Sequence, residues 1–447
     1  MRSWVQWRVM ADCGPFHDLT HEKLPLAVLQ ALQAQKLSAM LTAVTASNKF
    51  YKAKFKAAGL KSGDVSKISV TDLPFTLKSE IVKDQQKSPP FGSNHTFPIN
   101  DYCRYHQTSG STGAAVRWLD TRESWEWILR SWSYVLSSAG VKPKDRICFA
   151  FSFGPFLGFW SAYDAAAKFG ALCMPAGGMS TTARLRFMLD NGITVVCCTP
   201  TYALRMAETA AAENINIALS PVRLLIVAGE PGGSIPHTRA RIEELWGARC
   251  VDHYGMTEIG PAAFECEKVR GRLHIIESEF IAEALKPGGS EPAAPGESGE
   301  LVLTSLGRTA SPLLRYRTGD LVKMTRHSPC ACGRSFVALE DGILGRVDDM
   351  LVVRGVNVYP SAIEEVLRRF PTITEYRVEI TSVRAMSELK IAIEAGPDDR
   401  EAAATAKSVS ADLDRSLGLR ISVAALPPGT LPRFEMKATR WVRAVSE

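Results

Sequence analysis

The stretch Tyr105-His106-Gln107-Thr108-Ser109-Gly110-Ser111-Thr112-Gly113 combines hydroxyl side chains with glycine and carries no charge. Short apolar and aromatic segments lie on both sides of it, so we expect a strand, a glycine-rich loop and a second strand. Because glycine lacks a Cβ, such a loop lets several backbone N–H groups approach a polyphosphate closely. It lacks the Gly-Lys-Ser/Thr ending of a Walker loop, and taken alone it fits a solvated turn equally well.

The chain after this loop alternates between apolar strand segments and helical segments. We expect strands at residues 146–151, 171–175, 193–198, 222–228 and 249–254, and helices at residues 125–138, 158–169, 181–191, 201–214 and 235–246. Continuous apolar strands that alternate with helices favour a mainly parallel sheet covered on both faces. Polar loops at the carboxyl ends of such strands are the usual ligand sites.

The segments on either side of this region differ from it. Residues 24–60 have helical spacing, shorter β-rich segments follow residue 273, and a small unit of strands and helices is expected from residue 345 onward. We therefore expect an α/β fold. Its large N-terminal domain, residues 1–344, would contain doubly covered, mainly parallel sheets and a β-rich subdomain, and residues 345–447 would form a small, mobile α+β C-terminal domain.

The composition is that of an ordinary globular chain. It has 447 residues, of which 46% are hydrophobic and 22% charged, and its net charge of +6 is spread along the chain. Nucleic-acid binding is not expected because Lys and Arg do not cluster, and no apolar run is long enough to span a membrane. Ten cysteines in so long a chain, without a signal-peptide pattern, favour reduced thiols and a cytoplasmic location.

Six further motifs follow the glycine loop in a fixed order: Ala228–Gly232, His253–Glu258, Tyr316–Asp320, Gly345–Asp349, Arg354–Pro360, and Leu431–Arg433 with Lys437. In this order and spacing the chain resembles the adenylate-forming enzymes, which include acyl- and aryl-CoA ligases, adenylation domains and luciferases. The short length and the segment Leu73–Lys78 ahead of the loop look most like the phenylacetate-CoA ligase branch. The resemblance spans nearly the whole chain, and seven motifs in register are far more specific than any one of them.

The resemblance implies a reaction in two steps. ATP would activate a carboxylic acid as an acyl-AMP with release of pyrophosphate, and CoA would then take the acyl group as a thioester. The cofactors implied are ATP, Mg²⁺ and CoA. Two alternatives stay open: transfer of the acyl group to a carrier-protein thiol or an amine, and a nucleotide-binding homologue that has lost catalysis. Whether the chain acts as a monomer or as a homodimer also stays open.

The resemblance also assigns roles to the motif residues. The triphosphate would be held by Thr108, Ser109, Gly110, Ser111, Thr112 and Gly113. The rest of the nucleotide site would be formed by Gly229, Glu230, Pro231, His253, Tyr254, Gly255, Met256, Asp320 and Arg346, with Tyr254 stacked on the adenine and Asp320 bound to the ribose. Glu258 would coordinate Mg²⁺, with Thr257 beside it, and Lys437 would act on the carboxylate and α-phosphate during adenylation only.

Each of these residues also has an ordinary structural explanation. Glu258 fits an acidic residue at a helix N-terminus, Asp320 fits a turn, and Lys437 fits a solvated lysine near the chain end. One position departs from the family pattern, because Val116 stands where many members have a lysine after the loop. This departure leaves the phosphate charge to Mg²⁺ and backbone dipoles, with Arg117 next in sequence as an additional cation.

The segment Gly345-Arg346-Val347-Asp348 matches the family hinge, which makes Asp348 the expected pivot of the small domain. Arg354 and Gly355 would then line the CoA tunnel, since backbone without a Cβ can approach the pantetheine arm closely. A plain glycine turn between strand and loop is the alternative.

Two cysteine-containing segments suggest a metal site. Cys330 and Cys332 form a Cys-x-Cys pair, and Cys266 lies upstream on a separate segment. With His274 or His327 as the fourth ligand they could bind a structural zinc ion, as related enzymes of this branch often have such residues. Unligated buried thiols are the alternative reading.

The resemblance implies that part of the acid pocket is formed by the segment after the first core strand, where aromatic residues cluster at Phe151, Phe153 and Phe156. Gly177 and Gly178 would form the far wall, and Gly255 with Met256 the near wall. These residues favour an aryl or arylacetic acid, although several of the aromatic side chains also fit ordinary core packing.

Overall fold

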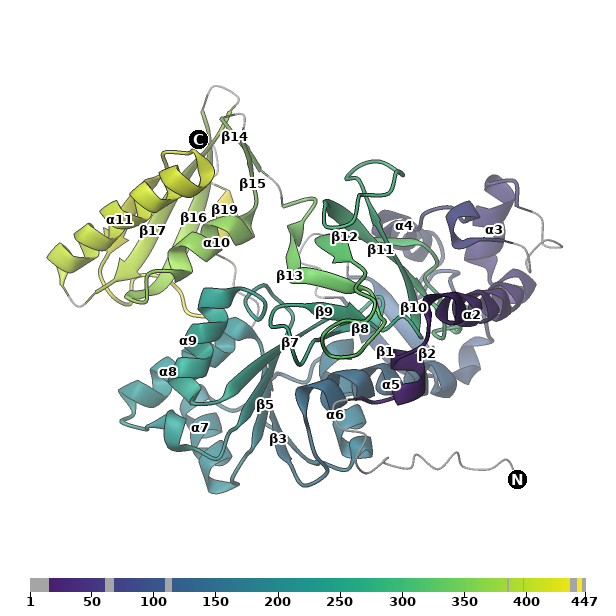
Figure 1. Cartoon of the computed structure of the whole chain (residues 1–447), viewed down its shortest axis with the longest axis horizontal. Helices are drawn as coiled ribbons and strands as arrows, with labels where there is room; N and C mark the ends of the chain where they lie inside the picture. Colours follow the sequence, from purple (N-terminus) through teal and green to yellow (C-terminus); the bar gives the residue numbers. More distant parts are fainter. Residues whose placement is uncertain are drawn as a thin grey trace.

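The computed structural model describes residues 16–60, 68–108, 115–349, 351–354, 356–383, 386–396, 398–434 and 440–443. Figure 1 shows a large domain built on one long sheet and a small C-terminal domain beside it. The α-helices are α1 (Leu19–Glu22), α2 (Leu26–Ser47), α3 (Lys49–Ala57), α4 (Lys78–Lys87), α5 (Arg122–Ala139), α6 (Leu157–Phe169), α7 (Thr181–Asp190), α8 (Pro200–Ala212), α9 (Pro236–Trp246), α10 (Pro360–Arg368) and α11 (Asp399–Leu417).

The strands of the large domain are β1 (Tyr102–Gln107), β2 (Arg117–Thr121), β3 (Arg146–Phe149), β4 (Leu172–Pro175), β5 (Val195–Cys198), β6 (Leu224–Val227), β7 (Arg249–Met256), β8 (Gly260–Glu265), β9 (Leu273–Ile275), β10 (Phe280–Leu285), β11 (Ser298–Ser305), β12 (Tyr316–Thr325) and β13 (Ala338–Arg346). The strands of the small domain are β14 (Leu351–Val353), β15 (Val356–Val358), β16 (Ile373–Val383), β17 (Met386–Ala395), β18 (Ser422–Leu426) and β19 (Trp441–Arg443).

The long sheet has eleven strands in the order β10-β11-β12-β13-β9-β8-β7-β6-β5-β3-β4. Strands β3 to β7 pair in parallel, as the alternation of strands and helices predicts. From β7 onward the pairing is antiparallel, so the β-rich subdomain continues the same sheet. The predicted α/β fold is therefore confirmed, and β7 is the strand at which its parallel and antiparallel halves meet.

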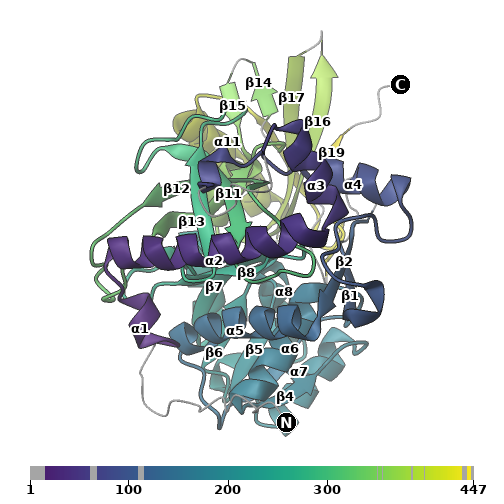
Figure 2. The same cartoon turned by 90° about the vertical axis from the view of Figure 1, so that its right-hand side faces the viewer.

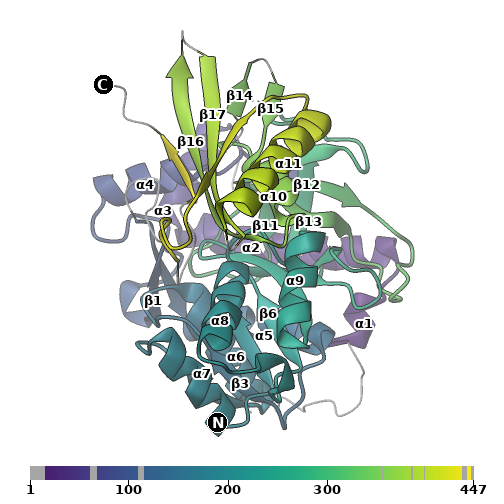
Figure 3. The ribbon, with the colours of Figure 1, turned by 90° about the vertical axis from the view of Figure 1, so that its left-hand side faces the viewer.

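Helices cover both faces of the parallel half (Figures 1 and 3). Successive strand residues point to opposite faces, so Ile147 and Phe149 pack in one core with α5 and α6. Their neighbour Cys148 packs in a second core with α7, α8 and α9. Both faces are apolar and both are closed, which explains why these strands have no polar alternation in the sequence.

The β1–β2 hairpin lies outside the long sheet and carries the glycine loop. Thr108 and Val116 close the base of the loop through two hydrogen bonds of 2.9 Å, from the Thr108 N–H to the Val116 carbonyl and from the Val116 N–H to the Thr108 hydroxyl. Residues 109–114, the centre of the loop, lie outside the described residues. Figure 2 shows α2 crossing the antiparallel half of the molecule, with α4 near the hairpin.

The small domain has a six-stranded sheet in the order β15-β14-β17-β16-β19, with β18 also paired to β17. Helices α10 and α11 cover one face of it, where Ile363, Val409 and Ile391 are buried together (Figure 3). The domain rests on the large one with α10 beside α9. The predicted boundary at residues 344 and 345 falls near the end of β13 and stays a prediction, as does the mobility of the domain.

Across the residues that the structure describes, no helix combines the length and apolarity needed to cross a membrane.

Candidate active site

Asp320 lies at the centre of a buried hydrogen-bond network. The Tyr254 hydroxyl donates to one carboxylate oxygen of Asp320 at 2.6 Å, and Arg346 donates to the other at 3.1 Å. Burial raises the pKa of this carboxyl, while the Tyr254 hydrogen bond and the Arg346 charge oppose that shift. Gly319 has a φ of +76°, and a Cβ there would lie 2.9 Å from the Arg346 guanidinium, so this position, at a register shift of β12 against β11, favours glycine.

Tyr254, which was predicted to stack on the adenine, is largely buried. Its ring is 8% exposed and belongs to the main core, and its hydroxyl is used by Asp320. Stacking on an adenine therefore stays a prediction for this residue. The next residue, Gly255, lies where the register of β7 and β8 shifts, and a Cβ there would lie 2.8 Å from the Gly260 carbonyl oxygen. This close approach forms the turn that presents Thr257 and Glu258.

Arg308 holds the turn that carries Thr257 and Glu258 through hydrogen bonds to its backbone. Its guanidinium donates two hydrogen bonds of 2.7 Å to Asp120 on β2. Its remaining nitrogen donates to the carbonyls of Thr257 and Glu258 at 2.9 and 2.7 Å. Both charged side chains are buried, with exposed fractions of 1% and 0%. The pair therefore ties the hairpin of the glycine loop to the backbone of the predicted Mg²⁺ ligand, and nothing in the sequence pattern indicated it.

Glu258 is itself largely buried, and its side chain is 8% exposed. The Lys78 ammonium lies 3.3 Å from its carboxylate. Lys78 is the last residue of the segment Leu73–Lys78, to which the sequence analysis gave no role. Arg117, the cation expected to assist at the loop, instead donates to the carbonyl of Pro90 at 2.7 Å.

The segment predicted to line the adenine follows β6. Gly229 has a φ of +93°, which suits glycine, and the Glu230 carboxylate accepts a hydrogen bond of 2.8 Å from the Thr201 N–H at the start of α8. His253 on β7 is half-buried, with its ring centroid 4.5 Å from that of Trp132. Desolvation lowers the pKa of this histidine to about 4, so it is neutral at pH 7. Contact of His253, Tyr254 or Met256 with the nucleotide stays a prediction.

Arg440 of the small domain contacts Thr201, the residue whose N–H binds Glu230. Its guanidinium pairs with Glu375 at 2.5 and 3.3 Å and donates across the domain boundary to the Thr201 hydroxyl at 3.2 Å. Arg440 and Thr201 are 7% and 8% exposed. Sequence reasoning missed this contact, because no local pattern links two residues on different domains. Lys437, predicted to be catalytic, lies outside the described residues, three positions before Arg440.

The predicted hinge lies next to Asp320, the residue predicted to bind the ribose. Arg346 donates to Asp348 at 2.9 Å as well as to Asp320, so one guanidinium joins both. Arg354 is exposed and pairs with Glu388 on β17 at 2.8 Å. Gly355 lies outside the described residues, as do Ser109, Gly110, Ser111, Thr112 and Gly113 of the loop.

The aromatic residues expected at the acid pocket are half-buried and contact one another. Phe151 stacks on Phe159 with centroids 4.3 Å apart, and Phe156 meets Phe159 edge to face at 5.7 Å. The Phe153 ring and the Phe151 carbonyl lie against Gly177, where a Cβ would be 2.9 Å from that carbonyl oxygen. Gly178 has a φ of +76° and open space around it. The aromatic segment and the predicted far wall at Gly177 therefore lie together, and the near wall at Gly255 and Met256 stays a prediction.

Cys266, His274, Cys330 and Cys332 form a buried cluster whose ligand atoms all lie within 4.8 Å of one another. The Sγ atoms of Cys266 and Cys330 are 3.9 Å apart, and Cys332 Sγ is 3.4 Å from His274 Nε2. The other histidine that the sequence left open, His327, is instead hydrogen-bonded to Glu340 at 2.7 Å. The structure thus selects His274 as the fourth member of the cluster.

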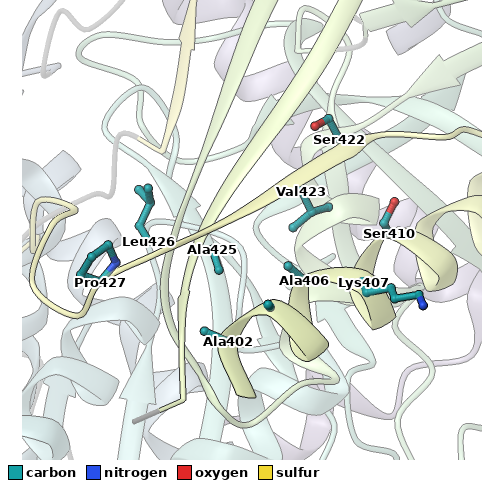
Figure 4. Close-up of a pocket in the computed structure, with 10 residues that line it drawn as sticks. Ala402, Ala406, Lys407, Ser410, Ser422, Val423, Ala425, Leu426 and Pro427 are labelled. Carbon is teal, nitrogen blue, oxygen red and sulfur yellow. The ribbon is translucent and has the colours of Figure 1, made fainter. Parts of the chain in front are cut away.

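A separate hollow of about 650 Å³ lies between α11 and β18 of the small domain (Figure 4). Small and apolar side chains line most of it, including Ala402, Ala406 and Val423. It contains none of the residues that the sequence analysis assigned to the site.

Two family models match the chain. One, described as "AMP-binding enzyme", matches residues 25–308, and the other, described as "AMP-binding enzyme C-terminal domain", matches residues 355–443. The chain therefore belongs to the AMP-binding enzyme family. Phenylacetate-coenzyme A ligase of Thermus thermophilus is 30% identical over 93% of this chain and 96% of its own length, and that of Escherichia coli is 30% identical over 92% and 94%. Within the family, the chain lies in the phenylacetate-CoA ligase-like branch.

Solved structures agree with this assignment. 2-Hydroxyisobutyryl-CoA ligase in the postadenylation state, in complex with an acyl-AMP, has a TM-score of 0.91 and 26% identity, covering 97% of this chain and 93% of that chain. The same enzyme in the thioesterification state has a TM-score of 0.71 and 27% identity, covering 95% and 91%.

Proposed function

We propose that the protein is an AMP-forming acid–CoA ligase that joins a carboxylic acid to CoA by way of an acyl-AMP. The observation that carries this conclusion is a set of links to β7, the strand where the two halves of the sheet meet. Tyr254 on β7 binds Asp320, and Arg308 joins β2 of the loop hairpin to the backbone of Glu258, which follows β7. A carboxylate is a poor electrophile, and bonding one of its oxygens to the α-phosphorus of ATP makes AMP the leaving group when a nucleophile attacks the acyl carbon. Such chemistry needs a place for the ribose, a place for the triphosphate and a cation at the reacting oxygens.

The described residues fit these needs. Asp320 has both carboxylate oxygens oriented by donors, which leaves lone pairs for the ribose hydroxyls. Glu258 offers one largely buried carboxylate, and Mg²⁺ is usually bound by one or two carboxylates together with substrate phosphates. The divalent ion would neutralise charge on the triphosphate there. Lys437 is proposed to bring the cation to the carboxylate and α-phosphate during adenylation.

The domain arrangement fits the adenylation half of the cycle. The chain resembles 2-hydroxyisobutyryl-CoA ligase more closely in its postadenylation state than in its thioesterification state, although the two comparisons cover nearly the same residues. Arg440 contacts Thr201 in this arrangement, and the Thr201 N–H binds Glu230 of the predicted adenine segment. The small domain would rotate about Asp348 before CoA attacks.

An aromatic or arylacetic acid is the proposed substrate class. The half-buried phenylalanines near Gly177 and Gly178 support it, because flat rings pack well on one another. The relatives named phenylacetate-coenzyme A ligase support it as well. Transfer to a carrier-protein thiol or an amine remains the second candidate for the last step.

The four-residue cluster is proposed to bind one structural zinc ion. For tetrahedral zinc with bond lengths of about 2.3 Å to sulfur and 2.0 Å to nitrogen, neighbouring ligands lie about 3.8 Å apart for two sulfurs and about 3.5 Å apart for sulfur and nitrogen. The measured separations of 3.9 Å and 3.4 Å fit this geometry. The other ring nitrogen of His274 lies 3.1 Å from the Phe336 carbonyl, which fixes the orientation of the ring.

Metal analysis of the purified protein tests the zinc site. We expect about one equivalent of zinc in the wild type and its loss in Cys332→Ser, while Cys103→Ser, at an exposed free cysteine, keeps it. Less than about a tenth of an equivalent in the wild type would overturn the assignment.

ATP–pyrophosphate exchange with a panel of acids tests the activity, and CoA or a carrier protein in the product assay identifies the acceptor. The Lys437→Ala variant should lose exchange but still form thioester from supplied acyl-AMP. Lys407→Ala, at an exposed lysine of the same domain, is the matched control. Wild-type protein without exchange for any acid would reject the proposed function, and unchanged exchange in Lys437→Ala would reject the role of that lysine.

A further inference from the structure

Lys78 is a cation of the site to which neither the sequence motifs nor the proposed mechanism gives a task. It is the first residue of α4, and its ammonium lies 3.3 Å from the Glu258 carboxylate. Its side chain is 42% exposed, whereas that of Glu258 is 8% exposed. An ammonium has three N–H donors, so the contact with Glu258 leaves donors for a ligand that reaches this carboxylate.

The backbone that carries Lys78 is firmly held. Thr76 exchanges backbone hydrogen bonds of 3.0 Å with Arg315 and Arg317 at the start of β12, the strand that bears Asp320. The Thr76 hydroxyl donates to the Leu314 carbonyl at 2.7 Å. The guanidinium groups of Arg315 and Arg317 lie over the Phe75 ring, at 4.1 and 5.1 Å from its centroid. The position of Lys78 relative to Asp320 is therefore set by the sheet.

The other end of α4 is attached to the glycine-loop hairpin. The Gln85 side chain donates to the Arg117 carbonyl at 2.7 Å and accepts from the Arg117 N–H at 3.0 Å. Helix α4 thus connects the strand that leaves the loop with the carboxylate proposed for Mg²⁺. Its first residue therefore lies at Glu258, and its last turn lies at the strand that leaves the loop.

Other cations close to the site are already engaged. Arg308 is fully occupied by Asp120 and two backbone carbonyls. Arg346 is shared by Asp320 and Asp348, and Arg117 faces the Pro90 carbonyl. Val116 stands at the position of the loop lysine and is 1% exposed. Within the part of the chain that the structure describes, Lys78 is therefore the cation best able to turn toward a ligand at Glu258.

We propose that Lys78 binds the β- and γ-phosphates of ATP and takes the place of the lysine that this glycine loop lacks. The inference rests on the proposed function, because it assigns a residue to the adenylation step. In that step a carboxylate oxygen of the acid forms a bond to the α-phosphorus. The bond from that phosphorus to the oxygen bridging the β-phosphate breaks, and pyrophosphate leaves with the electron pair. Lys78 stays protonated and stabilises the negative charge on the departing group.

Nucleotide binding tests this role without any turnover. Isothermal titration calorimetry would compare a non-hydrolysable ATP analogue with AMP on the wild type and on Lys78→Met. We expect the variant to bind the triphosphate about tenfold to a hundredfold more weakly, as for loss of a charge-assisted hydrogen bond. AMP should bind both proteins within about twofold, because it lacks the β- and γ-phosphates.

Two further variants separate this role from general effects. Lys83→Met removes an exposed lysine on the same helix and should change neither affinity. Lys78→Arg keeps the charge and should recover part of the loss. Equal weakening of ATP analogue and AMP in Lys78→Met, or no weakening of either, would overturn the inference. A wild type that exchanges no pyrophosphate with any acid, but still shows the selective loss in Lys78→Met, would instead reject the proposed function alone.

Discussion

Two buried arginines of this molecule have the same kind of partner but act on different parts of it. Arg308 in the large domain and Arg440 in the small domain each direct two nitrogens at one carboxylate, Asp120 and Glu375 respectively. The third nitrogen differs. That of Arg308 binds backbone carbonyls of its own domain, whereas that of Arg440 binds the Thr201 hydroxyl of the other domain.

Arg308 therefore positions its partners permanently, whereas the contact made by Arg440 depends on how the two domains are arranged. The Arg308 bonds lie within one folded domain, so the turn of Glu258 is held in every arrangement of the two domains. The Arg440 bond to Thr201 exists only while the small domain is docked in this way. Arginine thus stabilises the site in the first case and one arrangement of the domains in the second. Two of the measurements below test this contrast, and a third tests the buried surroundings of the Arg308–Asp120 pair.

The largest effect is expected for Arg308→Met. Removal of one partner leaves the fully buried Asp120 charge unpaired, which should lower the free energy of unfolding by about 3–5 kcal/mol. Both half-reactions should fall, because the Glu258 turn loses its support. Urea unfolding with the two activity assays measures this. The double variant Arg308→Met with Asp120→Asn should recover part of the stability, and a fully stable Arg308→Met would contradict the permanent role.

An intermediate effect is expected from His106, which lies on β1 and stacks on Trp125 at 5.1 Å. Burial lowers its pKa to about 4 from the usual 6.5, with Asp120 opposing the shift and Arg308 and Arg104 adding to it. The folded protein keeps this imidazole neutral, whereas the unfolded chain protonates it below about pH 6.5. The free energy of unfolding is therefore unaffected by His106 above about pH 6.5 and decreases as the pH falls from there toward 4. At pH 5 the loss is about 2 kcal/mol.

His106→Gln removes the titrating group and should reduce the decrease in unfolding free energy between pH 7.5 and pH 5 by that amount. Urea unfolding of both proteins at the two pH values gives the difference. Burial raises the pKa of Asp252 to about 7, so this residue changes the unfolding free energy with pH in the opposite direction. The difference between wild type and His106→Gln therefore isolates the effect of His106, whereas the total pH dependence of either protein does not. Equal pH dependence in both proteins would show that His106 is not held neutral.

The smallest effect is expected for Thr201→Ala, which removes only the acceptor across the domain boundary. Loss of one such hydrogen bond should slow ATP–pyrophosphate exchange about threefold to tenfold. Thioester formation from supplied acyl-AMP should not change. Thr209→Ala on the same helix removes a hydroxyl that bonds only within α8 and serves as the control. A matching loss in both half-reactions would mean that the contact is not specific to one state.

Much of the fold could be predicted from the sequence because its signals are local. The parallel strands are continuous apolar runs, and α6 (Leu157–Phe169) begins within one residue of the predicted helix at residues 158–169. The ends of other elements differ by a few residues, as for β7, which extends to Met256 because its last residues pair with β8. The three-residue strand β19 was missed, since so short a segment has no period to recognise.

The site was less predictable, because its key contacts join distant residues. The motif order identified Asp320 and Glu258, but it could not show that Lys78 reaches Glu258 or that Arg440 reaches Thr201. It also could not choose between His274 and His327, because the choice depends on which ring the fold brings to the cysteines. Tyr254 was identified as a site residue, although its bond to Asp320 was not foreseen.

Arg346 gives the predicted joint a way to respond to what the nucleotide site contains. Its guanidinium is shared between Asp320, which is predicted to bind the ribose, and Asp348, the predicted pivot. Rotation about Asp348 would have to pull this charge away from a buried carboxylate, which requires electrostatic work. A ribose bound at Asp320 competes for the same oxygens and reduces that work. The order of the two half-reactions could then follow from occupancy alone, with no separate signal to release the small domain.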